Sequence, residues 1–309
     1  MQQYVLSIII HNILVYNGKF ALYNLLCPFG KGGASLDEVF DILVIGSGPA
    51  GVSAALTARH RGKTALLITT APEDSPLYKA EHVDNYPGLP AATGAELVDS
   101  FLSHAEKSGV KLMRGRALAV ADLGAAFGVS VGSDFVQGRA VVLACGLTRA
   151  KPYPGEAEYL GRGVSYCATC DGMLYRGKNV AVIGLSADAP EEAEYLRGIG
   201  CNVEYFDAKR AKRYEIKGGE RVTALTADGE DFAVDCVFIL RSGLAPDSLL
   251  PGLALEGGHI AVDAGMATNI PGVFAAGDCT GAPYQVAKAA GEGNIAGLSA
   301  CKYIENTNR

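Results

Sequence analysis

Hydrophobic positions in this chain gather in short blocks that are separated by polar or glycine-rich segments. The block Phe40–Ile45 is apolar except for one aspartate, which is typical of a strand that is buried on both faces. Residues 52–61 have the pattern of a helix that ends at Gly62, and residues 64–69 form the next apolar block. Strand, helix and strand in this order predict the beginning of an α/β fold.

The same alternation continues to the end of the chain. A helix is expected over 94–108, and an Ala- and Gly-rich helix over 284–303. A second strand–turn–helix unit covers 179–197, so that it lies inside the first unit in sequence. Further strands are expected near residues 110–120, 127–132, 139–145, 201–206, 221–226, 231–235, 236–241 and 268–278.

Glycines mark the turn between the first strand and its helix. The run Gly46-Ser47-Gly48-Pro49-Ala50-Gly51 fits the pattern G-x-G-x-x-G. Gly46 permits a tight turn, Gly48 lets backbone N–H groups approach a pyrophosphate, and Gly51 allows helix and strand to pack closely. This context predicts a dinucleotide site. The next strand ends at Thr69-Thr70, so a carboxylate that could bind a ribose is not evident there.

The two strand–turn–helix units predict an α/β protein with two Rossmann-like lobes of the FAD/NAD(P)-binding type, the second inserted in the first. We expect residues 37–149 and 242–309 to form one lobe and residues 150–241 to form the inserted lobe. The two connections between the lobes are expected near Thr148–Lys151 and Ser242-Gly243.

Composition narrows the classes of function. The chain has 309 residues, 49% of them hydrophobic, and 39 glycines, which fits a globular α/β protein. A net charge of −6, without a pattern of interleaved basic and aromatic residues, argues against nucleic-acid binding. No uninterrupted apolar run of about 18 residues occurs, so no membrane span is predicted. Residues 1–36 form an N-terminal extension of unknown role, in which Asn17-Gly18 predicts a type I′ hairpin turn.

Eight cysteines are scattered along the chain, and only Cys167 and Cys170 are closely paired. This usage is typical of a reducing compartment, and we expect a cytoplasmic protein. The C-x-x-C spacing lets both sulfurs form a small ring that is readily reduced and re-oxidised. Zinc is the alternative, but a structural zinc needs four ligands and no second pair of ligands follows, so no metal is expected. The other cysteines are expected to be buried or inert thiols.

Four motifs in this order resemble the low-molecular-weight thioredoxin reductases, over about residues 40–304. They are the glycine turn, Asp84–Gly88, Cys167–Gly172 and Gly272–Asp278. The resemblance implies FAD as the cofactor. It assigns FAD contacts to the glycine turn and to five further residues, with Asp278 at the ribityl chain and the helix N-terminus after Gln285 at the flavin ring: Asn85, Gly277, Asp278, Gln285 and Val286.

The same resemblance implies roles for the dithiol. Cys170 would face the flavin, Cys167 would attack the disulfide of a thioredoxin, and Asp171 would shuttle the proton. No histidine lies near the pair in sequence, so Asp171 is the local acid–base candidate; its other interpretation is a turn or N-cap aspartate. Members of the family are homodimers, and the resemblance implies a homodimer here.

The inserted lobe departs from the NADPH-using members of that family, which carry G-x-G-x-x-A/G and a basic cluster after the next strand. Here Ser186 replaces the middle glycine, and its side chain occupies space that a pyrophosphate needs. Asp188 adds a negative charge at the helix N-terminus, and Asp207 stands where a 2′-phosphate would bind. The segment between Phe206 and Leu240 is too short for the usual next helix. Asp207 could favour NADH, but Ser186 and Asp188 oppose this too.

A flavin and a dithiol without a nucleotide site need another electron donor. The pattern resembles the ferredoxin-dependent flavin thioredoxin reductases, in which the flavin accepts single electrons and delivers a pair to a disulfide. Three alternatives remain: an NADPH-dependent thioredoxin reductase, an oxygen-using flavin dithiol oxidase, and a non-enzymatic redox sensor. Basic residues in the segment 207–221 could steer an acidic ferredoxin, or could be a solvated hairpin surface: Lys209, Arg210, Lys212, Arg213, Lys217 and Arg221.

Overall fold

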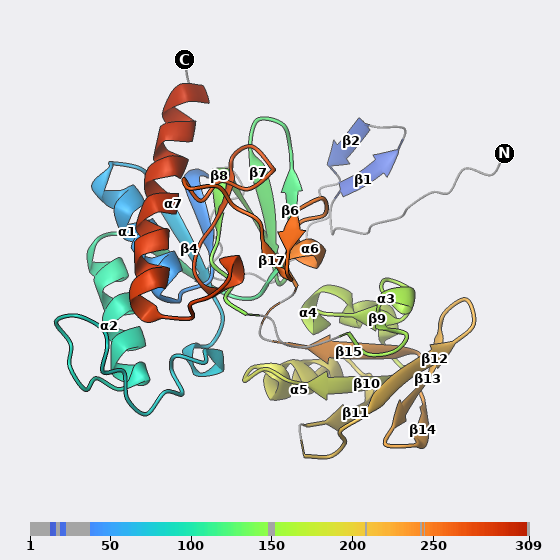
Figure 1. Cartoon of the computed structure of the whole chain (residues 1–309). Coiled ribbons are helices and arrows are strands. Elements are labelled where there is room, and N and C mark those ends of the chain that lie inside the picture. Colours follow the sequence, from blue (N-terminus) through green and yellow to red (C-terminus); the bar gives the residue numbers. More distant parts are fainter. Residues whose placement is uncertain are drawn as a thin grey trace. The chain divides into compact units, whose positions relative to one another are not determined.

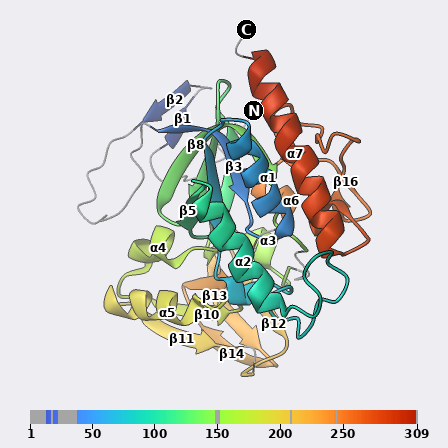
Figure 2. The ribbon, with the colours of Figure 1, turned by 90° about the vertical axis from the view of Figure 1, so that its left-hand side faces the viewer.

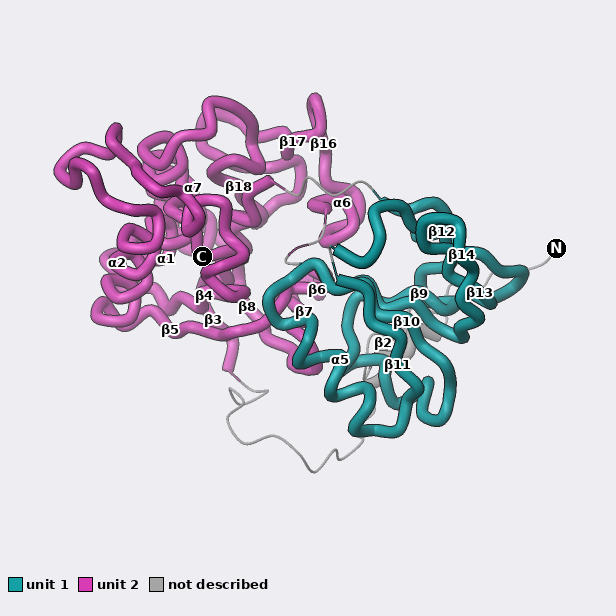
Figure 3. The backbone as a smooth tube through the Cα atoms, turned by 90° about the horizontal axis from the view of Figure 1, so that it is seen from below, with its two compact units in different colours: residues 1–34, 151–241 teal, residues 35–150, 242–309 magenta. Residues whose placement is uncertain are grey.

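The computed structural model describes residues 13–16, 19–22, 38–147, 152–207, 209–241, 243 and 245–307. The chain divides into two compact units, which Figure 3 shows in two colours. The larger unit contains residues 35–150 and 242–309, and the inserted unit contains residues 151–241 together with 1–34. Each unit carries its own sheet with parallel strands at its centre, as Figure 1 shows.

The larger unit is built on a seven-stranded sheet in the order β5-β4-β3-β8-β7-β6. The seventh strand, β18, pairs with residues 141–143 of β8. Strands β3, β4, β5 and β18 run parallel to their neighbours, whereas β6, β7 and β8 form an antiparallel meander. Leu43 lies opposite Leu66 on one side and Val141 on the other. The strand bounds are β3 Val39–Ile45, β4 Ala65–Thr69, β5 Lys111–Arg114, β6 Ala117–Asp122, β7 Phe127–Val131, β8 Asp134–Leu143 and β18 Val273–Ala275, with a small hairpin of β16 Leu255–Glu256 and β17 His259–Ile260.

Helices α1 and α7 lie side by side in Figures 1 and 2. Small residues bring them together: a Cβ on Gly293 would lie only 2.1 Å from the carbonyl oxygen of Ala50, and a Cβ on Gly297 would lie 2.7 Å from that of Ala54. Both helices pack their buried alanines on the sheet. The helices of this unit are α1 Pro49–His60, η1 Pro72–Asp74, α2 Gly94–Lys107, α6 Pro246–Leu249, η3 Asp278–Thr280 and α7 Val286–Thr307.

The inserted unit has a four-stranded parallel sheet in the order β11-β10-β15-β9 and a separate three-stranded antiparallel sheet, β12-β13-β14. All five residues of β15 and five of the six in β10 are buried, as expected for central parallel strands. Its elements are α3 Glu156–Tyr159, β9 Val164–Ser165, α4 Ala168–Asp171, η2 Gly172–Tyr175, β10 Asn179–Gly184, α5 Ala189–Gly198, β11 Asn202–Phe206, β12 Tyr214–Gly218, β13 Val222–Ala227, β14 Glu230–Ala233 and β15 Cys236–Leu240.

The predicted α/β class with Rossmann-type units is confirmed, with local corrections. Helix α1 begins at Pro49 rather than at residue 52, because proline is favoured in the first turn of a helix. The dithiol segment is helical, and β12 was not predicted as a strand. The segment predicted as a strand near 110–120 is divided between β5 and β6 by Gly115, whose φ is +155°.

Two further expectations concern the N-terminal hairpin and the segment between β11 and β15. Strands β1 Ile13–Tyr16 and β2 Lys19–Leu22 pair antiparallel with Tyr16 opposite Lys19, which confirms a hairpin. The turn type expected at Asn17-Gly18 lies outside the described residues. Among the described residues between β11 and β15 there is no helix, as the short spacing predicted. In the described part of the chain, no helix combines the length and the apolarity that crossing a membrane requires.

Candidate active site

The glycine turn of the larger unit leaves space for a ligand at one position only. A Cβ on Gly46 would lie 2.2 Å from the carbonyl oxygen of Ala144, and a Cβ on Gly51 would lie 1.8 Å from that of Gly46. Both glycines are therefore required by the close packing of the protein itself. A Cβ on Gly48 would meet no protein atom within 4 Å. Gly48 is also the N-cap of α1, so the open space lies where helix N–H groups bind a pyrophosphate.

The carboxyl ends of β3 and β18 bring the predicted cofactor residues together. Gly277, with φ +89°, follows β18, and a Cβ on it would lie 2.9 Å from the Cβ of Ala50 in α1. Ser47 and Thr69 share a hydrogen bond of 2.5 Å between their hydroxyl oxygens. Ligands of open parallel sheets bind at this edge, so the residues present fit a dinucleotide such as FAD.

The two segments predicted to flank the flavin also meet. The side-chain amide of Asn85 donates to Oε1 of Gln285, 200 positions further along the chain. Gln285 immediately precedes α7, whose first residue is Val286. The fold thus places both predicted residues at the N-terminus of α7, where the helix dipole favours negative charge. Asp278 begins the short helix η3 just before this point.

Sequence analysis missed two residues that shape this turn. The Gly277 N–H donates to the carboxylate of Glu292 over 2.9 Å. Lys288 Nζ donates to the carbonyl oxygens of Gly277, at 2.9 Å, and Gly281, at 2.6 Å. The i,i+4 spacing of this Lys–Glu pair near the start of a predicted helix was the available signal, although such pairs usually lie on solvated faces.

The inserted unit carries the dithiol as a disulfide. The sulfurs of Cys167 and Cys170 are bonded, with 5.3 Å between their Cα atoms. Cys167 is the N-cap of α4 and is buried, and its Sγ accepts the N–H of Cys170 over 3.1 Å. The predicted pairing is therefore present in the structure. Among the described residues, no group of three or more His, Cys, Asp or Glu side chains could hold a metal ion.

The other described thiols are free, and a side-chain hydrogen bond from Cys279 lowers the pKa of Cys145. Burial raises the pKa of Cys201 and of Cys301 above the ordinary value for a thiol. Cys145 is partly exposed, and Cys27 lies outside the described residues. The expectation of buried thiols is confirmed for four positions: Cys201, Cys236, Cys279 and Cys301.

Two carboxylates, rather than one, lie at the dithiol. Asp171 Oδ2 accepts a hydrogen bond of 2.7 Å from the Ser165 hydroxyl. The carboxylate of Glu192, which lies on α5, accepts the N–H of Ala168 over 2.9 Å at the first turn of α4. Sequence analysis found only Asp171, because Glu192 lies 24 positions from Ala168 and reaches the dithiol segment through the fold.

The second turn, after β10, differs from the first at its central position, where Ser186 stands in place of the open Gly48. A Cβ on Gly184 would lie 2.3 Å from the hydroxyl oxygen of Tyr205. The Ser186 hydroxyl is within hydrogen-bond reach of the Leu240 carbonyl oxygen, at 3.2 Å, and of the Asp188 carboxylate. Helix α5 begins only at Ala189, the sixth position of the motif, whereas α1 begins at its fourth position. The turn therefore presents fewer helix N–H groups to a phosphate.

Charge at this second turn also opposes a nucleotide. The first turn of α5 carries Glu191 and Glu192 next to Asp188, and three carboxylates at a helix N-terminus repel a pyrophosphate. Asp207 Oδ1 accepts the N–H groups of Lys209 and Arg210, each over 2.9 Å, so it closes a local turn.

Arg210, four residues after the end of β11, has structural partners. Its guanidinium pairs with Glu204 and lies 4.4 Å above the ring centroid of Phe206. It also donates to the Tyr205 carbonyl oxygen over 2.6 Å. These contacts hold the Arg210 side chain against β11.

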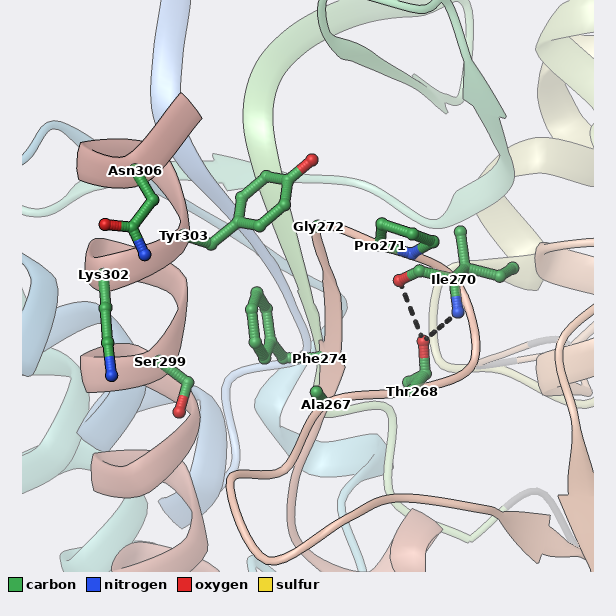
Figure 4. A pocket seen from close by; sticks show the side chains of 10 residues that line it. All are labelled: Ala267, Thr268, Ile270, Pro271, Gly272, Phe274, Ser299, Lys302, Tyr303 and Asn306. Atoms are coloured by element: carbon green, nitrogen blue, oxygen red, sulfur yellow. Dashed lines mark hydrogen bonds between the residues drawn. The ribbon is translucent and has the colours of Figure 1, made fainter. Parts of the chain in front are cut away.

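A shallow surface pocket of about 290 Å³ lies elsewhere in the larger unit (Figure 4). Phe274, Tyr303 and Lys302 are among its lining residues, and it surrounds Gly272 at the amino end of β18. The predicted cofactor residues follow the carboxyl end of that strand, so the pocket belongs to the opposite end. Despite its volume, it contains none of the residues that the chemistry requires.

A dinucleotide turn in one unit and a helix-borne disulfide in the other define a flavin-dependent disulfide oxidoreductase. The chain belongs to the family described as pyridine nucleotide-disulphide oxidoreductase, which matches residues 40–213 and 207–293. Within that family it is of the thioredoxin reductase type. The thioredoxin reductase of Listeria innocua serovar 6a is 34% identical over 307 residues, which cover 88% of this chain and 96% of that protein. FAD is the cofactor of this family, and the fit of the first turn agrees with it.

Solved structures agree with this assignment. A ferredoxin-flavin thioredoxin reductase from Clostridium acetobutylicum is similar with a TM-score of 0.83 and 38% identity, over 88% of this chain and 99% of that one. A thioredoxin reductase from Gloeobacter violaceus is similar with a TM-score of 0.76 and 30% identity, over 87% of this chain and 95% of that one. The resemblance to thioredoxin reductases and the assignment of FAD are thereby confirmed.

Proposed function

We propose that this protein is a cytoplasmic, homodimeric reductase that takes electrons from reduced ferredoxin and passes them through FAD and the Cys167–Cys170 pair to a thioredoxin disulfide. The observation that carries the choice of donor is the altered second turn. Ser186 places a side chain at the position where the first turn has the open Gly48, and Asp188 reverses the charge that a pyridine nucleotide needs. The similar Clostridium structure, a ferredoxin-flavin thioredoxin reductase, supports the same choice.

The residues of the dithiol segment have distinct roles in this proposal. FAD, when bound, supplies the electron pair that opens the disulfide. Cys167 is the better-stabilised thiolate, because its Sγ accepts the Cys170 N–H. It attacks one sulfur of the thioredoxin disulfide and forms a mixed disulfide, and the departing thioredoxin sulfur takes a proton from Asp171. Cys170 then gives its proton to the Asp171 carboxylate and attacks Cys167. The second thioredoxin sulfur leaves and takes that proton from Asp171, which releases reduced thioredoxin and restores the disulfide.

Two surface features support partner binding. Met173 and Leu174, directly after the dithiol helix, have 55% and 60% of their surface exposed, which provides an apolar contact for a thioredoxin. In the basic segment, Arg213 and Lys217 pair with nearby aspartates at 3.8 and 3.3 Å, as Arg210 does with Glu204. No ion pair to a described residue is formed by three exposed basic residues, which could steer an acidic ferredoxin: Lys209, Lys212 and Arg221.

The second candidate is an NADPH-dependent thioredoxin reductase, which the names of the curated relatives and of the family favour. Steady-state reduction of thioredoxin separates the two. With a ferredoxin-reducing system we expect turnover that falls as salt rises, and with NADPH or NADH no turnover above background. Turnover with NADPH that equals or exceeds the ferredoxin rate would overturn the proposed donor, and salt-independent rates would remove the docking role of the basic segment. Peroxide formed in proportion to dithiol substrate would instead indicate an oxygen-using dithiol oxidase.

A further inference from the structure

Ser165 lies two residues before the first cysteine of the dithiol, on strand β9. It is buried, with 4% of its surface exposed, and it lies opposite Phe238 in the pairing of β9 with β15. The sheet therefore fixes its backbone. A buried hydroxyl at this place needs hydrogen-bond partners, and all of its partners belong to the dithiol segment.

The Ser165 hydroxyl has one proton to donate and two neighbouring acceptors. Asp171 Oδ2 lies at 2.7 Å and the Cys167 carbonyl oxygen at 3.2 Å. The shorter bond is made to a carboxylate, and hydrogen bonds to charged groups are about twice as strong as neutral ones. The proton therefore points to Asp171. The oxygen accepts the Cys167 N–H over 3.1 Å, so a single side chain joins the Cys167 backbone to the acid.

We propose that Ser165 is a positioning residue of the thiol–disulfide exchange: it holds the Asp171 carboxyl group beside the dithiol, where this group can give its proton to the departing sulfur. This inference rests on the proposed role of Asp171 as the proton donor. Ser165 itself touches no reacting atom, because its bonds are to the Asp171 carboxylate and to backbone groups.

Other titratable groups also face Asp171, and their charges must be considered. Burial raises the pKa of Tyr175 and of Cys236, so both are uncharged near neutral pH. Their elements, η2 and β15, therefore place no additional charge against the carboxylate. The carboxylate of Glu192, on α5, lies at the first turn of the same helix as Asp171, where it accepts the N–H of Ala168.

The test compares two small disulfides whose leaving groups differ. Hydroxyethyl disulfide releases a basic thiolate that needs a proton, whereas Ellman's reagent releases an acidic thiolate that does not. The FAD-loaded full chain is reduced anaerobically with dithiothreitol, desalted and mixed with one of the two disulfides. The protein thiols that have not reacted are then alkylated with N-ethylmaleimide and counted. For Ser165→Ala we expect the reaction with hydroxyethyl disulfide to slow about tenfold, since the acid that supplies the proton is no longer held beside the dithiol.

The same variant should react with Ellman's reagent within about twofold of the wild-type rate, because no proton donor is needed there. Ser165→Thr keeps the hydroxyl and should restore the rate with hydroxyethyl disulfide. Equal slowing of the reactions with both disulfides in Ser165→Ala would overturn the inference and leave a structural role only. If Ser165→Ala does not retain FAD, Ser165→Gly provides a second variant without the hydroxyl.

Asp171→Asn separates this inference from the proposed function on which it rests. It should show the same selectivity as Ser165→Ala but with a larger loss. If Asp171→Asn affects both disulfides equally, the proton-donor role of Asp171 is wrong and the inference fails with it. If Asp171→Asn is selective and Ser165→Ala is not, only the role of Ser165 is wrong. The assay needs neither ferredoxin nor thioredoxin, so its outcome does not depend on the proposed donor.

Discussion

The turn at residues 46–51 and the turn at residues 184–189 follow equivalent parallel strands and lead into equivalent helices, but they differ in what surrounds them. At the first turn, the space beside Gly48 is open and α1 begins immediately. At the second turn, Ser186 replaces the central glycine, and its hydroxyl lies 3.2 Å from the Leu240 carbonyl oxygen. Three carboxylates also surround the start of α5.

This difference shows that topology and ligand binding are set by separate residues. The strand–turn–helix backbone depends on buried apolar strands, which both units have. A nucleotide depends in addition on open space at the turn and on the sign of the charge at one helix end. In the inserted unit the first property is present, whereas Ser186 and Asp188 oppose the second.

Replacing Cys170 should separate the two units most clearly, because it should affect thioredoxin turnover but not FAD content. Cys170→Ser should reduce thioredoxin turnover to background, because the electron pair then has no disulfide to enter. FAD content should not change, since FAD depends on the turn at residues 46–51. Thioredoxin turnover and the ratio of flavin to protein absorbance measure the two effects. Retained turnover would mean that thioredoxin is reduced by a route without this disulfide.

The stability of the inserted unit should depend on one buried ion pair. Glu156 and Arg241, which lie near the two ends of the inserted segment, are 2% and 7% exposed and form two hydrogen bonds. Glu156→Gln should lower the free energy of unfolding by about 3 kcal/mol, because it leaves a buried guanidinium without its counter-charge. The exposed neighbour Glu158→Gln is the matched control and should change stability by less than about 0.5 kcal/mol. Equal effects of the two variants in chemical denaturation would contradict this account.

The same pair gives a pH dependence with a defined sign. Burial alone would raise the pKa of Glu156, but hydrogen bonds from Arg241 and from the Tyr153 N–H outweigh it, and the pKa lies below its ordinary value of 4.5. A lowered pKa in the folded state means that this stabilisation is present above 4.5 and is lost as the pH falls through the lowered value. Glu156→Gln should therefore unfold with a weaker pH dependence in this acidic range.

A methyl group placed in the open first turn should weaken FAD binding without disturbing the protein. Gly48→Ala adds a Cβ that meets no protein atom within 4 Å, so it enters only the space of the ligand. Overpacking of this kind is worth about 1–3 kcal/mol, and we expect the Kd of FAD to rise about tenfold. The matched change Ser186→Ala in the second turn should leave FAD affinity unchanged. Fluorescence titration of the apoprotein with FAD measures both variants.

The smallest effect is expected from removing one charge at the second turn. Asp188→Asn should improve any residual binding of NADP⁺ by only about two- to fivefold, because a single charge near a helix end contributes about 0.3–1 kcal/mol. The Ser186 side chain still occupies the central position of the turn in this variant. A gain of a hundredfold or more, measured by calorimetry, would mean that charge alone closes the site.

The features that sequence could predict are those whose residues are adjacent in the chain. The glycine turn, the C-x-x-C pair and the two hairpin strands were found because each signal lies within a few positions. Strand β12 was missed because its inward positions, Tyr214 and Ile216, alternate with charged residues over only five positions. Such a short run cannot be distinguished from a solvated turn.

The contacts that decide the site come from residues far apart in sequence. Glu192 reaches the dithiol helix from α5, and Tyr205 reaches Gly184 from the next strand. Neither residue has a sequence signal of its own, because a glutamate on a helix and a tyrosine in a strand are ordinary surface and core residues. The departure at Ser186 was visible in sequence, but the approach of the Tyr205 hydroxyl to Gly184 was not.

The central claim is tested most directly by anaerobic titration of the FAD-loaded protein, with the visible absorbance of the flavin as the readout. We expect stoichiometric NADPH and NADH to leave the flavin band unchanged, and reduced ferredoxin to bleach it fully, with recovery on addition of oxidised thioredoxin. Complete bleaching by one equivalent of NADPH would contradict the account, because it would show that the second turn accepts a pyridine nucleotide.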